Sequence, residues 1–455
     1  MAEIKPFKAV LYNQDKVNGT AKVVCPPYDV INEKARENYA NLSPYNMVRL
    51  ILPTKNEAEQ AGCESVYAFA KKQLDDWMEK EVLCHAKEEA IYLYEQEYVY
   101  LGEKKKRQGI IALLKMDDGG NSSKTKSRIH AHEHTHLGPK EDRLQLIRQV
   151  KANLSPVFVL FPDKNHIIRR ITDKYVHSQP LIDVKADSVR HKLWRITDNK
   201  LINEVQRDLK TCDIFIADGH HRYEVACNFR EEERKALGNP DRELDCDYLM
   251  TYLTDLNSRG LTIMPTHRLI KNVPPDLING LPGELTKFFD LHRAKDRHDL
   301  FVMLGKAVKN ECVLGMYQKE AGHKKEGKFY LLRLKSGINL DTVIDIDKPK
   351  EYKKLCVVIL NYLILGKMLK IDVDLCNSDA STVKHISYTN DTELAVKMVD
   401  RSEAQLLFFL NPVNVEVLAH VAAQGERMPP KSTFFYPKLL TGLVINKFSE
   451  ESGLA

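Results

Sequence analysis

The segment that most constrains the fold runs from Ile214 to Glu224. It reads Ile-Phe-Ile-Ala-Asp-Gly-His-His-Arg-Tyr-Glu, a short apolar run that leads directly into an acid, a glycine, two histidines and an arginine. The pattern predicts a buried strand that ends at Ala217, a turn at Asp218-Gly219, and a helix from about His220 to Leu237. Since strands that feed helices build α/β folds, we expect a chain of mixed α/β class.

The same turn predicts an anion site. A helix N-terminus carries a partial positive charge, and a glycine lets the backbone approach a ligand closely, so phosphate suits Gly219. Arg222 adds a planar fork for phosphate oxygens, and His220 and His221 exchange protons near neutral pH. Asp218 is a candidate ligand for a cation such as Mg²⁺ or a candidate acid or base. The alternative is a helix capped by Asp218 whose histidines are merely solvated.

Composition limits the class of protein and its compartment. The chain has 455 residues, 43% of them hydrophobic and 29% charged, which is typical of a globular protein with more than one domain. A net charge of +5 is small for this length and gives no support to nucleic-acid binding. The nine cysteines form no C-x-x-C pair, as expected for reduced thiols. The N-terminus lacks a signal-peptide core, so we expect a cytoplasmic protein.

The longest apolar run and the alternating segments predict further elements. Residues 355–369 are too few to span a bilayer and predict a buried helix, so we expect no membrane partner. Residues 65–80 follow helical spacing. Residues 90–100 and 109–116 predict an antiparallel hairpin with Lys104 to Arg107 in its loop. Its tyrosine stripe is expected to pack under helices rather than to form a stacking surface.

A proline pair marks the expected domain boundary. Near Val273-Pro274-Pro275 the first half of the pattern ends, and a second region of mixed strand and helix signals begins. We therefore expect an N-terminal domain over residues 1–270 and a C-terminal mixed α/β domain over residues 271–455.

A histidine-rich segment forms the second candidate site. In an extended chain, His130, His132, His134 and His136 share one face and Glu133 lies on the other. Histidines at this spacing can chelate a transition metal, with Glu133 as a base or a metal ligand. The alternatives are a role of His132 and Glu133 in binding or protonating a phosphorylated ligand, or a solvated loop.

Two proline-rich segments supply the remaining candidates. In Cys25-Pro26-Pro27-Tyr28-Asp29-Val30 the prolines stiffen the backbone, so Asp29 is either an acid, base or metal ligand on a rigid turn or the N-cap of a helix over residues 30–39. Near the C-terminus, Lys431, Ser432, Thr433 and Lys438 carry donors that suit anionic oxygens, without the glycines of a P-loop. The aromatic residues 434–436 are alternatively a core strand.

Six motifs together resemble a large, mainly prokaryotic family carried as a conserved domain of unknown function and often labelled ParB-like. They follow in order over nearly the whole chain: residues 26–31 (Pro-Pro-Tyr-Asp-Val-Ile), 46–52 (Asn-Met-Val-Arg-Leu-Ile-Leu), 132–135 (His-Glu-His-Thr), 140–144 (Lys-Glu-Asp-Arg-Leu), 217–224 (Ala-Asp-Gly-His-His-Arg-Tyr-Glu) and 428–433 (Met-Pro-Pro-Lys-Ser-Thr). The resemblance extends to the ParB/sulfiredoxin-like superfamily and to its free-serine kinases, because residues 219–226 are similar to the nucleotide-binding turn of these proteins.

This resemblance implies a function as well as a fold. It implies that Gly219 and Arg222 hold the phosphates of a nucleotide such as ATP or ADP, with His220 and His221 beside them. His220 stands where sulfiredoxin has its reactive cysteine, so sulfinic-acid reduction is not implied, and no helix-turn-helix of ParB type is evident. We expect phosphoryl transfer or hydrolysis on a small, serine-like metabolite, with Mg²⁺ bridging the phosphates. The alternatives are a non-catalytic nucleotide-responsive or DNA-associated regulator and a metal-dependent hydrolase at residues 130–136.

Overall fold

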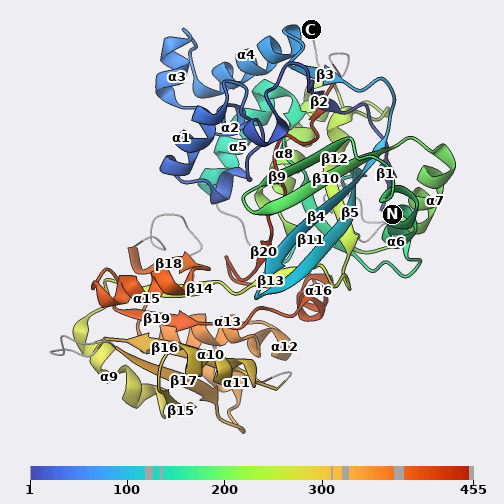
Figure 1. Ribbon diagram of the computed structural model, residues 1–455. Coiled ribbons are helices and arrows are strands. Elements are labelled where there is room, and N and C mark those ends of the chain that lie inside the picture. The colour runs from blue at the N-terminus through green and yellow to red at the C-terminus, as the bar shows by residue number, and fades with distance from the viewer. Residues whose placement is uncertain are drawn as a thin grey trace. The chain divides into compact units, whose positions relative to one another are not determined.

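The computed structural model describes residues 2–117, 127–133, 137–308, 311–319, 327–373 and 384–449. The chain forms two compact units, each assembled from separate parts of the sequence. Unit 1 contains residues 1–131, 138–262 and 435–455, and unit 2 contains residues 132–137 and 263–434. The chain thus passes into unit 2 at residue 263, close to the expected boundary at residue 270, but its C-terminal segment belongs with unit 1. Both units combine helices with a sheet, which confirms the mixed α/β class (Figure 1).

A large mixed sheet forms the framework of unit 1. Within the described residues it has nine strands, in the order β6-β11-β8-β12-β5-β4-β10-β9 with β1 paired to β5. The β11–β6 and β12–β8 pairs are parallel, and the other pairs are antiparallel. The strands are β1 (Ile4–Lys5), β4 (Ile91–Tyr100), β5 (Glu103–Lys115), β6 (Ile129–His130), β8 (Val157–Phe161), β9 (Ile182–Ala186), β10 (Val189–Ile196), β11 (Ile214–Asp218) and β12 (Tyr248–Asp255).

Helices and short strands complete unit 1. The helices are α1 (Glu33–Leu42), α2 (Val48–Ile51), α3 (Lys55–Gln60), α4 (Val66–Glu79), α5 (Leu137–Val150), α6 (Ile167–Tyr175), α7 (Asn199–Leu209) and α8 (His220–Ala236), with 3-10 turns η1 (Thr20–Lys22), η2 (Tyr28–Val30) and η3 (Asp245–Asp247). Two small ladders join β2 (Val10–Tyr12) to β3 (Leu83–His85) and β7 (Ala152–Asn153) to β21 (Asn446–Lys447). The helix expected at residues 65–80 is confirmed as α4, whose N-cap is Ser65.

Alternation along the strands gives the sheet of unit 1 two different faces. Ile91 and Leu93 join a core that also contains apolar residues of α6, α7 and α8. Tyr92, Tyr94 and Tyr98 point to the other side and are buried there, so the tyrosine stripe is a packed face as expected. The C-terminal segment contributes to the cover, because the ring of Tyr436 lies 5.5 Å from that of Tyr98.

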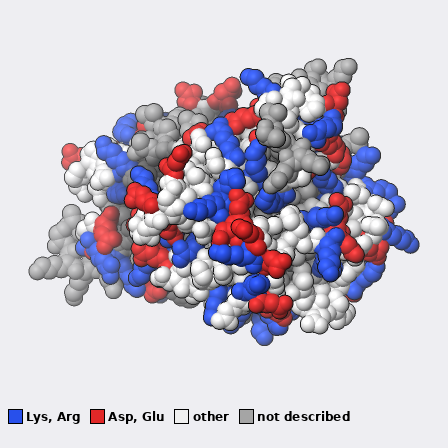
Figure 2. Space-filling view, turned by 90° about the horizontal axis from the view of Figure 1, so that it is seen from above, with Lys and Arg blue, Asp and Glu red and all other residues white. Residues whose placement is uncertain are grey.

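The expected position of the hairpin loop in unit 1 is wrong. The hairpin turn lies at Leu101-Gly102, and Lys104, Lys105 and Lys106 belong to strand β5 instead of a loop. The reason is that Leu101 and Gly102 both have positive φ angles and close a tight turn before the lysines begin. On the face drawn in Figure 2, basic and acidic side chains are interspersed.

An antiparallel sheet forms the framework of unit 2. Within the described residues it has six strands in the order β15-β17-β16-β19-β14-β18. These are β14 (His267–Ile270), β15 (Phe289–Ala294), β16 (Val313–Gln318), β17 (Lys328–Leu334), β18 (Ile386–Thr389) and β19 (Leu406–Phe409). Its helices are α9 (Pro275–Leu285), α10 (Arg297–Gly305), α11 (Leu340–Val343), α12 (Lys350–Lys353), α13 (Cys356–Val358), α15 (Thr392–Asp400) and α16 (Val415–Ala423).

The apolar run at residues 355–369 is a buried helix in unit 2. It begins as α13 and continues as a π-helix, η4 (Ile359–Met368). Among the helices that the structure describes, none has the length and apolar character needed to cross a membrane. Strands β13 (Thr262–Met264) and β20 (Phe434–Tyr436) lie at the two positions where the chain changes unit, so residues 434–436 are indeed a strand.

Candidate functional site

The predicted strand–turn–helix is present in unit 1. Strand β11 ends at Asp218, and the seventeen-residue helix α8 begins at His220. Gly219 lies between them as the N-cap residue, with φ 93° and ψ 31°. Because the left-handed region is costly for residues with a Cβ atom, the turn requires glycine at this position. A shift of register between Ile216 and Asp218 lies next to this turn and alters the pairing at the end of β11.

Asp218 does not cap α8, which was the alternative interpretation of this residue, because Gly219 is the N-cap. Its Oδ1 atom accepts a hydrogen bond from Nζ of Lys438, and its Oδ2 atom lies 3.0 Å from Nη2 of Arg222. Burial alone would raise the pKa of Asp218, but the charges of Lys438 and Arg222, with a further contribution from His220, hold it well below the ordinary value. The carboxylate is therefore ionised and fully engaged with cations.

Arg222 lies back over the turn that it follows. Its Nη1 atom donates to the carbonyl oxygen of Pro156 at 2.5 Å. A Cβ atom at Gly219 would lie 2.8 Å from Nη2 of Arg222, so the guanidinium packs directly against this glycine. With Lys438, two cations face one carboxylate, and the turn keeps an excess of positive charge beside the N-terminus of α8.

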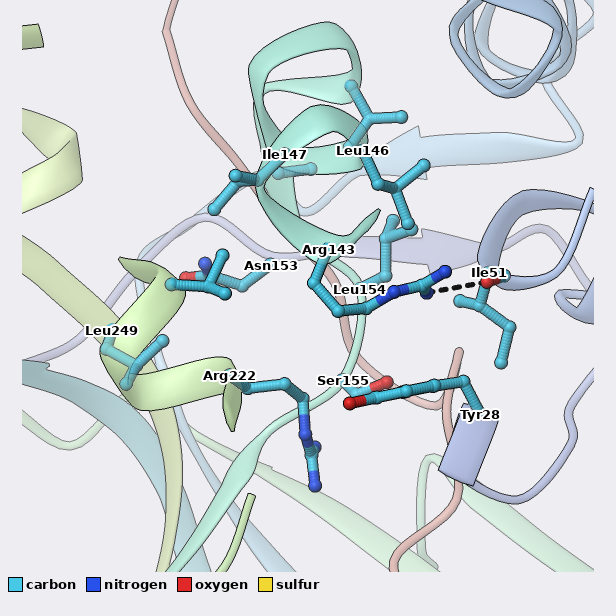
Figure 3. A pocket seen from close by; sticks show the side chains of 13 residues that line it. Tyr28, Ile51, Arg143, Leu146, Ile147, Asn153, Leu154, Ser155, Arg222 and Leu249 are labelled. Carbon is cyan, nitrogen blue, oxygen red and sulfur yellow. Dashed lines mark hydrogen bonds between the residues drawn. The ribbon is translucent and has the colours of Figure 1, made fainter. Parts of the chain in front are cut away.

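A pocket lies beside the turn (Figure 3). Its volume is about 70 Å³, which is room for one small group or a few water molecules. Tyr28, Arg143, Ser155 and Arg222 supply polar groups to its wall. The rest of the wall is mainly apolar: Ile51, Leu146, Ile147, Val150, Ala152, Leu154, Val225 and Leu249, with Asn153 as a further polar residue.

Tyr28 and Arg143 are held together at this pocket. The guanidinium of Arg143 lies 4.5 Å from the ring centroid of Tyr28, and its Nη1 donates to the carbonyl oxygen of Ile51 at 2.6 Å. Burial raises the pKa of Tyr28 to about 12, assisted by Asp29 and opposed by Arg143 and Arg222. Tyr28 is therefore a neutral hydroxyl group at neutral pH, able to donate a hydrogen bond.

Four of the six sequence motifs meet around this pocket. The wall takes Tyr28 from the first motif, Ile51 from the second, Arg143 from the fourth and Arg222 from the fifth. Asn46 of the second motif is fully buried and donates to the carbonyl oxygens of Lys22 and Val24, which fixes the loop before Tyr28. Arg143 was part of a motif but had no predicted role, because sequence spacing does not show that α5 packs against η2.

The C-terminal segment carries Lys438 to Asp218 and is anchored in the sheet of unit 1. Arg107 is fully buried and donates to the carbonyl oxygens of Tyr436 and Pro437. Gln96 donates to the carbonyl oxygen of Lys438 at 2.9 Å. Lys438 was expected to contact an anionic ligand; it binds the carboxylate of Asp218, and its contact with a ligand stays a prediction. Arg107 was missed because it ends a lysine run that resembled a loop.

The other two motifs meet in unit 2. Nε2 of His132 lies 3.1 Å from Oγ1 of Thr433, and Oε1 of Glu133 accepts a hydrogen bond from the backbone N–H of Lys431 at 2.9 Å. Ser432 donates to the carbonyl oxygen of Pro429. The two predicted candidate segments, almost 300 residues apart in sequence, are therefore neighbours. Their placement in one cleft with Asp218 to Arg222 of unit 1 stays a prediction.

The remaining candidates are dispersed. His130 belongs to unit 1, where its Nε2 lies 3.0 Å from Oδ1 of Asp213. His134 and His136 are outside the described residues. Asp29 is exposed on η2. Its alternative role as the N-cap of a helix over residues 30–39 is wrong, because the side chain of Asn32 caps α1. In the described part of the chain, no three His, Cys, Asp or Glu side chains are grouped as a metal site would need.

Comparison with solved structures finds distant likenesses. A conserved hypothetical protein from Pyrococcus furiosus is 13% identical over 69% of this chain and 89% of its own, with a TM-score of 0.32. A free serine kinase in complex with AMP is 12% identical over 71% and 90%, with a TM-score of 0.35. SbnI from Staphylococcus aureus with a C-terminal truncation is 12% identical over 73% and 85%, with a TM-score of 0.32. At these scores the likenesses carry no argument about this chain.

Comparison with protein families is decisive, although comparison with curated proteins gave no match. The model of the family described as "Protein of unknown function (DUF1015)" matches residues 4–342. The match includes the Gly219 turn and the parts of the pocket wall contributed by η2, α5 and α8. The expected membership in a family of unknown function is thereby confirmed, and the chain belongs to the DUF1015 family.

Proposed function

We propose that the Gly219 turn of unit 1 binds a phosphate group of a nucleotide or of a phosphorylated small metabolite. The observation that carries this proposal is the left-handed Gly219 at the N-terminus of α8, with the guanidinium of Arg222 packed against it. The backbone N–H groups of a helix N-terminus and a planar guanidinium are both donors that match phosphate oxygens. Lys438 adds a second cation within the same cluster.

The reaction that best fits this arrangement is phosphoryl transfer or phosphate hydrolysis on a small metabolite. In such reactions most of the catalysis is the stabilisation of charge on the phosphoryl oxygens, and Arg222 and the turn would supply it. His220 and His221 follow the turn directly and are the candidate proton-transfer groups. Tyr28 presents a neutral hydroxyl group to the neighbouring pocket, where it could bind an acceptor or a leaving group.

Asp218 holds the two cationic side chains of the site in place and is not a metal ligand in this proposal. Both of its oxygens are engaged, one by Lys438 and the other by Arg222. The turn as it stands does not fit Mg²⁺ at Asp218, and Arg222 and Lys438 meet the charge of a phosphate instead. An ATP or ADP ligand would place one phosphate at the turn, next to the pocket of about 70 Å³ that shares Arg222 with it and admits one small group.

Several finer expectations are part of the same proposal. They are the kinship of the fold with ParB/sulfiredoxin-like proteins, the contribution of His132, Glu133 and Lys431 to Thr433 to the site of unit 1, a catalytic role of Asp29, and a cytoplasmic location. The proposed phosphate site does not depend on any of these expectations.

The test is calorimetric titration of the full chain with ATP, ADP and CTP, combined with assays of phosphoryl transfer to serine and of phosphate release from phosphoserine. Arg222→Ala is expected to weaken binding about 10- to 100-fold, the usual value of charge-assisted hydrogen bonds. Lys235→Ala removes an exposed cation from the last turn of the same helix and is expected to change nothing.

The outcomes separate the candidate functions. Turnover that is lost with Arg222→Ala supports a phosphotransferase or a phosphatase. Binding without turnover would reject the enzyme and leave a nucleotide-responsive regulator. Failure of all three nucleotides and of phosphoserine to bind would reject the phosphate site itself.

A further inference from the structure

Unit 2 contains a buried arginine that forms no ion pair with an acidic residue of the described ranges. Arg268 lies on β14 and is only 1% exposed. Its Nη1 atom donates to the carbonyl oxygen of Thr266, and its Nη2 atom donates to that of Lys431 at 3.2 Å. Its Nε atom is buried without a hydrogen-bond partner among the residues that the structure describes. Arg268 is therefore incompletely satisfied in the interior of unit 2.

The charge of Arg268 is compensated only at longer range. No Asp or Glu of the described ranges forms an ion pair with it, and its cationic face lies over the ring of Tyr388 at 5.2 Å. Burial lowers the pKa of Arg268, and Tyr388 and Glu133 oppose this only in part. A guanidinium stays protonated in proteins, so a positive potential persists at this position.

Arg268 contributes to the wall of a cavity of about 620 Å³ that lies within unit 2. This volume is within the range of small-molecule sites. Thr266, Asn411 and Ser432 bring polar side chains to the same wall, and the N-terminal turn of α16 borders it. Among its carboxylates, Glu311 is paired with Arg333 at 2.6 Å, and Glu351 and Glu416 are exposed. The least compensated charge in the wall is thus positive and buried.

We propose that this cavity binds a small organic anion through its carboxylate or phosphate oxygens. The positive potential of Arg268 attracts the anion, since a charge in a poorly hydrated cavity acts more strongly than one in water. The hydroxyl and amide groups of Thr266, Asn411 and Ser432 then offer hydrogen bonds that orient it. The site is independent of the phosphate site at Gly219, because every residue of its wall belongs to unit 2.

Cys356 gives a direct readout, because it lies half-buried in the cavity wall. The full chain is alkylated with iodoacetamide, and the rate at each cysteine is followed by peptide mass spectrometry. Inorganic phosphate or citrate is expected to slow alkylation of Cys356 several-fold at constant ionic strength, with chloride as the reference. Cys63, a half-buried thiol of unit 1, is expected to react at an unchanged rate. Equal rates at Cys356 in all three salts would overturn the proposal.

Variants distinguish the anion site from other causes of protection. Arg268→Met keeps the length of the side chain without its charge and is expected to abolish the anion effect at Cys356. Arg293→Met makes the same change at an exposed position of β15 and is expected to retain it. Should Arg268→Met fail to fold, Val417→Trp fills the cavity from α16 and is expected to abolish the effect as well. Persistence of protection in either cavity variant would contradict the proposal.

Two further comparisons identify the class of anion and test whether the cavity of unit 2 is separate from the phosphate site at Gly219. Protection by phosphate alone assigns a phosphate ligand, and protection by citrate alone assigns a carboxylate ligand; both support an anion site. Arg222→Ala in unit 1 is expected to leave the protection of Cys356 intact. Loss of protection in that variant would contradict a separate site in unit 2.

Discussion

Gly219 meets two separate demands, and a substitution can show both. Its φ of 93° is unfavourable for other residues, and a Cβ atom would displace the guanidinium of Arg222. We predict that Gly219→Ala lowers the free energy of unfolding by about 1–2 kcal/mol and also weakens phosphate binding. Gly238, just beyond the other end of α8, is the matched control, with φ 74° and open space around its Cβ position. Gly238→Ala should show the loss of stability in urea denaturation but not the loss of binding in calorimetry. Equal binding by both variants would show that the contact with Arg222 is unimportant.

The ion cluster at Asp218 predicts a pH-dependent stability. The pKa of Asp218 is held below its ordinary value of 3.8, so the cluster stabilises the folded state above that pH and loses this contribution as the pH falls through the lowered pKa. Lys438→Met removes one cation, lets the pKa of Asp218 rise, and is expected to cost about 2–5 kcal/mol at neutral pH. The cost should shrink in acid, as the pH falls through the lowered pKa of Asp218 and its carboxylate becomes protonated. Lys71→Met, in an exposed pair on α4, is the control and should cost less than about 1 kcal/mol. A cost of Lys438→Met that does not vary with pH would contradict the assigned ion pair.

At the scale of elements, helix α5 joins parts of unit 1 through one side chain. Arg143 links α5 to the ring of Tyr28 on η2 and to the carbonyl oxygen of Ile51 at the end of α2. We predict that Arg143→Met destabilises the protein by about 2–3 kcal/mol, because it leaves a buried carbonyl oxygen without its charged donor. Arg148→Met, on the same helix, removes a partly exposed ion pair with Glu232 and should cost less than about 1 kcal/mol. Urea denaturation measures both changes, and equal costs would reject the linking role of Arg143.

Individual elements were predictable where their signals are local. The strand before Asp218, the helix from His220 and the helix that Ser65 caps all follow from periodicity and capping within a few residues. The hairpin loop was wrongly predicted at the lysine run, because charged residues are common in loops, whereas the turn is formed by Leu101 and Gly102 with positive φ angles. Asp29 failed as a cap because Asn32, three residues later, makes the capping bond. At the cap, two polar residues competed for one local role, whereas at the hairpin the turn is formed by two uncharged residues, so composition decided neither position.

At the scale of the whole molecule, the sequence indicated candidate residues for the site but not which residues they contact. Lys438 reaches Asp218 across 220 residues of sequence, and Arg107 meets Pro437 across 330. Neither pairing has a local signal, because contacts between distant segments depend on the topology of the whole sheet. The same reason explains why Glu133 and Lys431 were both candidates without being recognised as neighbours.

The contacts of the C-terminal segment indicate that unit 1 needs this segment to fold. Phe435 packs against Phe158, Thr441 exchanges backbone hydrogen bonds with Cys25, Ile445 does the same with Val10, and Phe448 stacks on Phe229. Each fully buried large apolar side chain contributes about 1.5–3 kcal/mol, so the loss of several exceeds a typical stability of about 5–15 kcal/mol.

A chain that ends at Thr433 should therefore leave unit 1 unfolded, whereas a chain that ends at Ser449 keeps all of these contacts and should fold. Hydrogen exchange read at β4, β5 and β12 distinguishes the two, because amides in a folded central sheet exchange slowly and those of an unfolded unit exchange at once. Because Lys438 is lost with the segment, the shorter chain should also fail to bind phosphate ligands. Slow exchange in all three strands of the shorter chain would show that the segment lies on a sheet that is stable without it. In that event the contribution of Lys438 to the phosphate site could be measured separately from the stability of unit 1.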